Sequence, residues 1–170
     1  MSYSIRIYGD PVLREQSREV ASFDEKLSDF AGYLVKAMQD DSGLGLAAPQ
    51  IGVLDRVVAI DRSFGESGDD IWVLVNPEVI ETDGKCTFEE GCLSVPGIYE
   101  DVVRPESVRL KYQDLDGVEH VVDVDGLLAR VFQHEADHLD GVLFVDRLSV
   151  VKRQILARSL KSLAEKGTIG

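Results

Sequence analysis

The chain has 170 residues, 44% of them hydrophobic, which is enough to bury the core of one domain spanning 1–170. Its formal net charge of −13 argues against a general role in binding DNA or RNA, and no run of eighteen apolar residues predicts a membrane span. The first ten residues lack the pattern of an export signal, so we expect a cytoplasmic protein whose two cysteines, Cys86 and Cys92, are free thiols.

The first predicted element is an amphipathic helix near residues 22–42. Ser22 and Glu25 have the spacing of a capping box at its start, and Gly43 is expected to end it. The apolar residues that fall on one helical stripe are Leu27, Phe30, Ala31, Leu34 and Met38. This stripe should pack against the core.

The segment "GLGLAAPQIG", from Gly43 to Gly52, follows this helix. Its G-x-G pattern does not predict a phosphate-binding loop, because it follows a helix instead of a strand and Pro49 interrupts the helix that should begin there. The small residues would instead permit close approach of a substrate, and Gln50 could donate an amide hydrogen bond. A tight turn packed by small residues explains the segment equally well.

Short runs rich in β-forming residues follow between Arg56 and about Asp125. They are "RVVAI", "IWVLV", "SVRLKYQD" and "VEHVVDV", with "DLDG" as a turn between the last two. Several antiparallel strands are therefore expected.

Within this region, "EEGCLSVPG" places Cys92 at a bent strand end before Pro96, where a thiolate could face a cleft. A buried, unreactive cysteine is the commoner interpretation of Cys92 taken alone. Cys86, in "KCTFEE", is typical of an ordinary strand residue.

A second helix is predicted after the N-cap Asp125 and before the C-cap Gly141, and it contains "QHEADHLDG". On a helix, residues four apart project from the same side, so His134 and His138 could bind one metal ion with Glu135 beside them. This is the HExxH pattern, in which the carboxylate handles the protons of metal-bound water. The alternative is a pair of histidines that are satisfied at a surface or core edge.

The third predicted helix is "VVKRQILARSLKSLAEKG". Its amphipathic pattern runs through Val151, Ile155, Leu160 and Leu163. The tail 150–170 carries a formal charge of +4, which leaves −17 on the remainder of the chain. It is either a solvated helix face or a docking element for a polyanion.

Strands and helices are segregated along the chain, so an α+β fold is expected. We predict antiparallel strands packed around the central helix that carries HExxH, with one helix on its N-terminal side and an amphipathic helix on its C-terminal side.

A catalytic metal site needs a third protein ligand and an open position. In a metzincin protease Gly141 would fit the motif, but Phe144 occupies the place of the third histidine. Glu165 lies on the basic helix and His120 lies in a strand pattern, so neither is a convincing ligand. Cys92 remains as the candidate for the third ligand. Two alternative functions stay open at this point: a zinc endopeptidase, and a non-catalytic, ribosome-associated metal-binding module.

Together and in this order, "GLGLAAPQ", "EGCLSVP" and "QHEADHLDG" resemble the peptide deformylases, metal enzymes that remove the formyl group from the N-terminal methionine of new bacterial and organellar proteins. The resemblance extends to "IRIYGDPVLRE", "VDGLLAR" and the basic final helix, and so covers nearly the whole chain. It implies one divalent metal ion, most often ferrous iron and alternatively Zn²⁺, Ni²⁺ or Co²⁺, held by Cys92, His134 and His138.

The same resemblance implies roles for three further residues. Glu135 would be the general acid and base, while the Gln50 side-chain amide and the Leu93 backbone N–H would stabilise negative charge on the formyl oxygen.

The substrates implied are N-formylmethionyl nascent peptides. Leu127 and Val131 lie on the helical stripe that leads to His134, and could form an apolar wall for the methionine side chain or simply pack in the core. The resemblance adds Gly43, Leu44, Gly45 and Phe88 to the substrate-binding residues.

Some positions depart from this pattern or extend it. Arg130 is a polar exception at the pocket rim, and Tyr99 stands where a basic residue would contact the peptide backbone. The family suggests that Glu90 pairs with Arg104 to fix the Cys92 loop. The basic C-terminal helix would dock on ribosomal RNA.

Overall fold

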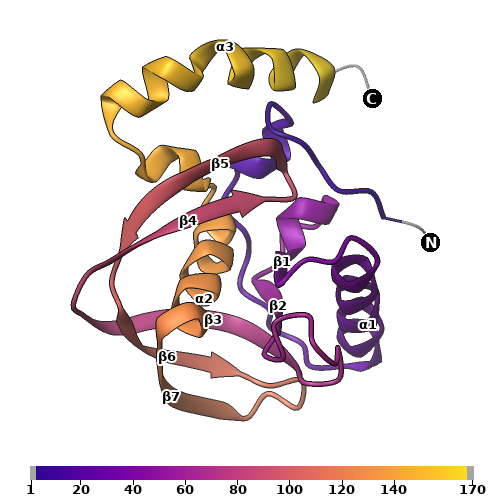
Figure 1. The fold of residues 1–170 in the computed structure, drawn as a ribbon. Coiled ribbons are helices and arrows are strands. Elements are labelled where there is room, and N and C mark those ends of the chain that lie inside the picture. The colour runs from indigo at the N-terminus through magenta and orange to yellow at the C-terminus, as the bar shows by residue number, and fades with distance from the viewer. Residues whose placement is uncertain (1–2, 168–170) are drawn as a thin grey trace.

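Two antiparallel sheets enclose the helix that carries HExxH in the computed structural model, which describes residues 3–167 (Figure 1). The larger sheet has the order β1-β2-β3-β6-β7, and its strands are β1 (Gly45–Ala47), β2 (Val57–Asp61), β3 (Ile71–Asp83), β6 (Ser107–Gln113) and β7 (Glu119–Asp125). The smaller sheet pairs β4 (Cys86–Cys92) with β5 (Val95–Arg104). The expected α+β fold is confirmed.

The apolar pattern explains the place of each strand in the larger sheet. β2 is buried along its whole length, as expected for a strand covered on both faces. In β6 the buried residues Val108, Leu110 and Tyr112 alternate with more exposed ones, so this strand has one face in the core. The predicted turn before β7 is confirmed by the bond from the Asp114 N–H to the Val118 carbonyl, at 2.9 Å.

Helix α1 (Glu25–Asp40) covers the β1 and β2 side of the larger sheet. The predicted capping box is wrong, because the helix begins after Asp24, whose carboxylate accepts a hydrogen bond from the Leu27 N–H at 3.1 Å. Glu25 therefore lies in the first helical position and not in the third. The predicted stripe is buried, apart from Phe30, which is half-buried.

The central helix α2 (Gly126–Leu139) packs its apolar face on the larger sheet, where Ala129 and Phe132 join a core cluster with Ile60 and Leu110. Asp140 is its C-cap, and Gly141 follows in a left-handed conformation with φ 75°. A side chain on Gly141 would also lie 2.6 Å from the Arg14 carbonyl oxygen, so both the backbone conformation and the packing require glycine.

Helix α3 (Val150–Gly167) lies beyond the small sheet, at the top of the view in Figure 1. The predicted apolar face is wrong in its first half, because Val151 and Ile155 are 64% and 73% exposed. Leu160 follows Ile155 by five residues, which is about 140° around a helix, so the two cannot share a face. The buried side is instead formed by Leu156, Leu160 and Leu163.

Three short 3₁₀ helices complete the described chain: Pro11–Arg14, Ala48–Ile51 and Phe144–Arg147. Both cysteines are free thiols, as expected. Within residues 3–167, no helix combines the length and the apolar character that crossing a membrane would require.

Candidate metal centre and active site

Three potential metal ligands from two distant segments meet at the side of α2. The Cys92 sulfur and one nitrogen each of His134 and His138 all lie within 4.8 Å of one another. The two histidines share a helix face because they are four residues apart, and the Cys92 sulfur lies 3.4 Å from His138 Nε2. This donor set fits a divalent metal, since a thiolate and two imidazoles are ligands of zinc and iron sites.

The local backbone of β4 directs Cys92 toward α2. The pairing of β4 with β5 is regular up to Glu90 opposite Glu100, and it then shifts before Cys92 pairs with Val95. A bulge of this kind bends a strand and reorients the side chain that follows. Next to it, Gly91 gives room for the Tyr99 ring, because a Cβ on Gly91 would lie 2.5 Å from that ring.

The other ligands considered earlier lie elsewhere or have other partners. Phe144, which occupies the third-histidine position of a metzincin, is buried and stacks on His134 with ring centroids 6.0 Å apart. His120 lies beside Asp114, at 2.8 Å, and is not part of the metal cluster.

A buried carboxylate orients the first histidine. Glu90 Oε1 lies 2.8 Å from His134 Nδ1, which leaves Nε2 of that ring for a metal. Arg104 donates to both oxygens of Glu90, from Nε at 2.6 Å and from Nη2 at 3.0 Å, which confirms the predicted pair. Burial opposes the ionisation of Glu90, but the hydrogen bonds of His134 and Arg104 outweigh it and lower its pKa to about 2.

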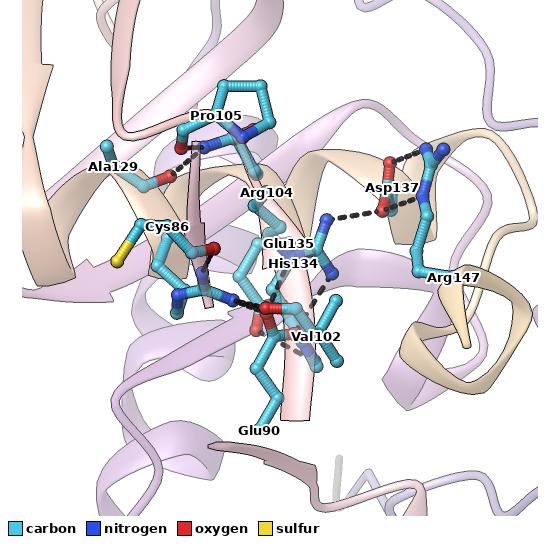
Figure 2. A network of polar contacts seen from close by, with 12 residues as sticks. Cys86, Glu90, Val102, Arg104, Pro105, Ala129, His134, Glu135, Asp137 and Arg147 are labelled. Atoms are coloured by element: carbon cyan, nitrogen blue, oxygen red, sulfur yellow. Dashed lines mark hydrogen bonds and ion pairs between the residues drawn. The ribbon is translucent and has the colours of Figure 1, made fainter. Parts of the chain in front are cut away.

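The polar network continues from Arg104 to Asp137 and Arg147, as Figure 2 shows. Arg104 also donates to Asp137 from Nη1 at 2.9 Å, and Asp137 accepts two further hydrogen bonds from Arg147. The sequence analysis did not find the roles of Asp137 and Arg147. The signal was present in the spacing, because Asp137 lies three residues after His134 and so on a neighbouring part of the helix surface.

The pKa values of the two histidines are shifted in opposite directions. Although desolvation lowers it, the pKa of His134 lies well above its usual value because of hydrogen bonds with Cys92 and Glu90. Desolvation, together with the charge of His134, lowers the pKa of His138 well below its usual value.

Glu135 is buried beside the metal ligands, and its Oε2 has no hydrogen-bond partner among residues 3–167; the same holds for His138 Nδ1. Burial raises the pKa of Glu135 to about 7, against the opposing charges of His134 and Arg104. A carboxylate with a pKa near neutrality and a free oxygen is suited to accept and return a proton.

A cavity of about 200 Å³ opens beside these groups. Its walls are formed by Leu44, Gly45, Gln50, Phe88, Glu89, Glu90, Gly91, Cys92, Leu93, Leu127, Arg130, Val131, His134 and Glu135. All of the predicted substrate-binding residues except Gly43 are among them. Gly43 lies behind Leu93, whose Cδ1 would be 3.0 Å from a Cβ at that position.

The segment "GLGLAAPQ" forms β1 and a 3₁₀ helix, and this backbone holds the Gln50 side chain in place. The Ala47 N–H donates to Gln50 Oε1 at 2.9 Å, so the amide nitrogen points the other way. That nitrogen donates to Ser94 Oγ at 3.1 Å and lies 3.5 Å from the Cys92 sulfur. Ser94, which the sequence analysis did not single out, is thus the resting partner of Gln50.

A cysteine sulfur and an HExxH helix that converge beside a cavity and a buried carboxylate are typical of metal-dependent hydrolases. A family model described as polypeptide deformylase matches residues 2–154. The chain belongs to this family. Its members remove the formyl group from the N-terminus of nascent peptides, so the chain is a hydrolase of protein biosynthesis. Neither the endopeptidase nor the non-catalytic alternative is supported.

Individual relatives agree with the family match. The peptide deformylase of Acidobacterium capsulatum is 46% identical over 160 residues, which cover 94% of each chain. Among solved structures, the peptide deformylase of Plasmodium falciparum superposes with a TM-score of 0.93 at 33% identity, and that of Thermus thermophilus with 0.90 at 40% identity. Both structural matches cover 98% of each chain.

Proposed function

We propose that the chain removes the formyl group from N-formylmethionyl peptides at the cavity beside α2, with Cys92, His134 and His138 holding one divalent metal ion. The observation that carries this assignment is the convergence of these three ligands beside Glu135, with Cys92, His134 and Glu135 lining one cavity. When bound, the metal acts as a Lewis acid and lowers the pKa of water toward about 7.

Glu135 accepts the proton of the attacking water at Oε2 and delivers it to the leaving amine. Its burial and its raised pKa support both halves of this transfer, since a group with a pKa near the working pH can take a proton and give it back. The amide of Gln50 and the backbone N–H of Leu93 donate to the formyl oxygen as negative charge builds there. Gln50 reaches that oxygen by exchanging its hydrogen bond with Ser94.

The methionine side chain occupies the apolar part of the cavity. Leu127 and Val131 form the wall on α2, and Leu44 and Phe88 face it from the other elements. Gly45 allows the backbone of β1 to approach α2, and Gly43 leaves room for the Leu93 side chain.

For the metal we propose ferrous iron, with Zn²⁺, Ni²⁺ and Co²⁺ as substitutes. A soft thiolate can bind all of these ions, so their availability decides which of them the site holds. Protein purified without oxygen should contain iron and should lose activity in air as the iron is lost. Stable activity in an aerobic, iron-free preparation would contradict the assignment.

The decisive experiment follows formate, free amine and internal cleavage products from a formyl-Met peptide with anaerobically purified protein. Glu135→Ala should keep the metal and lose roughly 10²–10⁴ in rate, while Cys92→Ala should lose both metal and activity. Cys86→Ala is the matched control, since Cys86 is a half-buried thiol on the same strand but outside the cluster. Internal cleavage without formate would instead indicate an endopeptidase.

We further propose that the enzyme works in the cytoplasm and meets nascent chains by docking α3 on ribosomal RNA. The support is the exposed basic residues on α3, which are Arg153, Arg158, Lys161 and Lys166. Replacing Arg153, Arg158 and Lys161 by glutamate should abolish co-sedimentation with ribosomes while activity on a small peptide is kept. Unchanged co-sedimentation would contradict the docking.

A further inference from the structure

A second arginine reaches the carboxylate that orients His134. Arg130 lies one helical turn before His134, is only 5% exposed, and donates a hydrogen bond to Glu90 Oε2. Its guanidinium also donates to two backbone carbonyls, that of Val102 at 3.0 Å and that of Cys86 at 2.7 Å. All three acceptors belong to the β4–β5 hairpin, whereas Arg130 itself belongs to α2.

Glu90 has hydrogen-bond partners at both oxygens without Arg130. Arg104 donates to each of its two oxygens, and His134 Nδ1 lies 2.8 Å from Oε1. Burying a guanidinium is costly unless its N–H groups are hydrogen-bonded. Here two of the three hydrogen bonds of Arg130 go to the carbonyls of Cys86 and Val102. The contacts that distinguish Arg130 from Arg104 are therefore those with the β4–β5 hairpin.

The position of this hairpin sets one wall of the cavity. β4 and β5 pair with each other and not with the larger sheet that α2 covers. Phe88 projects from β4 at the cavity, 54% exposed, and the Arg130 guanidinium lies over its ring with 5.9 Å to the ring centroid. The opposite wall, Leu127 and Val131, lies on the same helix as Arg130.

We propose that Arg130 is a positioning residue that determines specificity for the first side chain of the substrate. Its planar, five-donor fork joins α2 to β4 and β5 through three acceptors and lies over the Phe88 ring, which fixes the distance between the two walls of the cavity. This inference rests on the proposed function, in which that cavity takes the methionine side chain.

The test measures kcat and KM for formylated peptides that differ only in the first residue: methionine, norleucine, leucine or phenylalanine. Arg130→Met keeps the length and loses the donors, while Arg130→Lys keeps the charge and loses the fork. In both variants the preference for methionine over phenylalanine should fall by roughly tenfold, the size of effect expected from a changed pocket wall, and should fall mainly through KM. Arg109→Met is the matched control, since Arg109 is 45% exposed on β6 and is not among the residues that line the cavity.

Phe88→Ala provides a second, independent measurement. It should cause the same loss of selectivity, and combining it with Arg130→Met should cause little more, because both changes act on one wall. Unchanged selectivity in Arg130→Lys would overturn the inference. An equal fall in kcat for all four peptides in the Arg130 variants, together with loss of bound metal, would also overturn it, because Arg130 would then act by orienting His134. Failure of the unchanged protein to release formate would refute the proposed function itself, and so is a distinguishable result.

Discussion

The substitution Gly45→Ala adds one methyl group where β1 lies against α2 and Glu135. The backbone conformation of Gly45 is open to any residue, but a Cβ there would lie 2.8 Å from Cγ of Glu135 and 3.0 Å from Cγ1 of Val131. Ordinary contacts between such carbons are about 3.5–4.0 Å, so Gly45→Ala forces β1 and α2 apart or rotates Glu135.

Stability and activity should respond to Gly45→Ala to different extents. Overpacking of this kind costs about 1–3 kcal/mol, of which the lower backbone entropy of alanine offsets about 0.5–1 kcal/mol, so the free energy of unfolding should fall by no more than about 2.5 kcal/mol. If Glu135 is the acid–base group, as proposed, a displacement of about 1 Å can cost roughly 10² in rate. Urea unfolding gives the first quantity, and formate release at matched metal content gives the second.

Gly32→Ala on α1 is the control for this experiment. Apart from the adjacent residues and the backbone of α1 itself, nothing in residues 3–167 lies within 4 Å of a Cβ at Gly32, so alanine should stabilise the helix by about 0.5–1 kcal/mol and leave activity unchanged. If Gly45→Ala retained full activity, the close contact of β1 with Glu135 would not be what positions that carboxylate.

Three further predictions concern stability. Asp61 accepts hydrogen bonds from the Ser63 hydroxyl and from the Ser63 and Gly65 N–H groups, and these bonds lower its pKa. The stability that the ionised Asp61 contributes is therefore complete above the usual aspartate pKa range and is lost as pH falls through the lowered pKa. Asp61→Asn should lower the free energy of unfolding by about 1–3 kcal/mol at pH 7 in urea titrations, and by less in acid. A Cβ on Gly9, whose φ is 103°, would lie 2.6 Å from Cα of Ala164, so Gly9→Ala should loosen α3, and unchanged hydrogen exchange along α3 would argue against this packing. Removing the metal with a chelator should lower the Tm, and adding it back at about 1,000 times its Kd should restore about 4 kcal/mol; a Tm that ignores metal would contradict the site.

Short-range regularities made much of the fold predictable from the sequence. The i, i+4 spacing of His134 and His138 requires nothing but a helix to bring the two rings together, and the alternation in β6 requires nothing but a strand with one buried face. The errors arose where two local solutions compete. Ser22 and Asp24 are both good caps, and the choice between them depends on where the first turn meets the core.

Contacts between distant segments could not be derived in the same way. Cys92 lies 46 residues from His138, and nothing near it in the chain distinguishes a ligand from a buried thiol. The family resemblance supplied that residue, and the bulge between Glu90 and Cys92 explains how it reaches α2.

The sequence by itself determined the helix with its histidine pair, the strands of the larger sheet other than β1, and the nature of the chemistry, because periodicity and residue type are local properties. Tertiary structure alone decided which face of α3 is buried, that Gly45 lies against Glu135, and that Arg130 joins α2 to the β4–β5 hairpin. Each of these depends on which surfaces meet once all the elements have packed, and that is set by the sum of many contacts across the chain and not by any one segment.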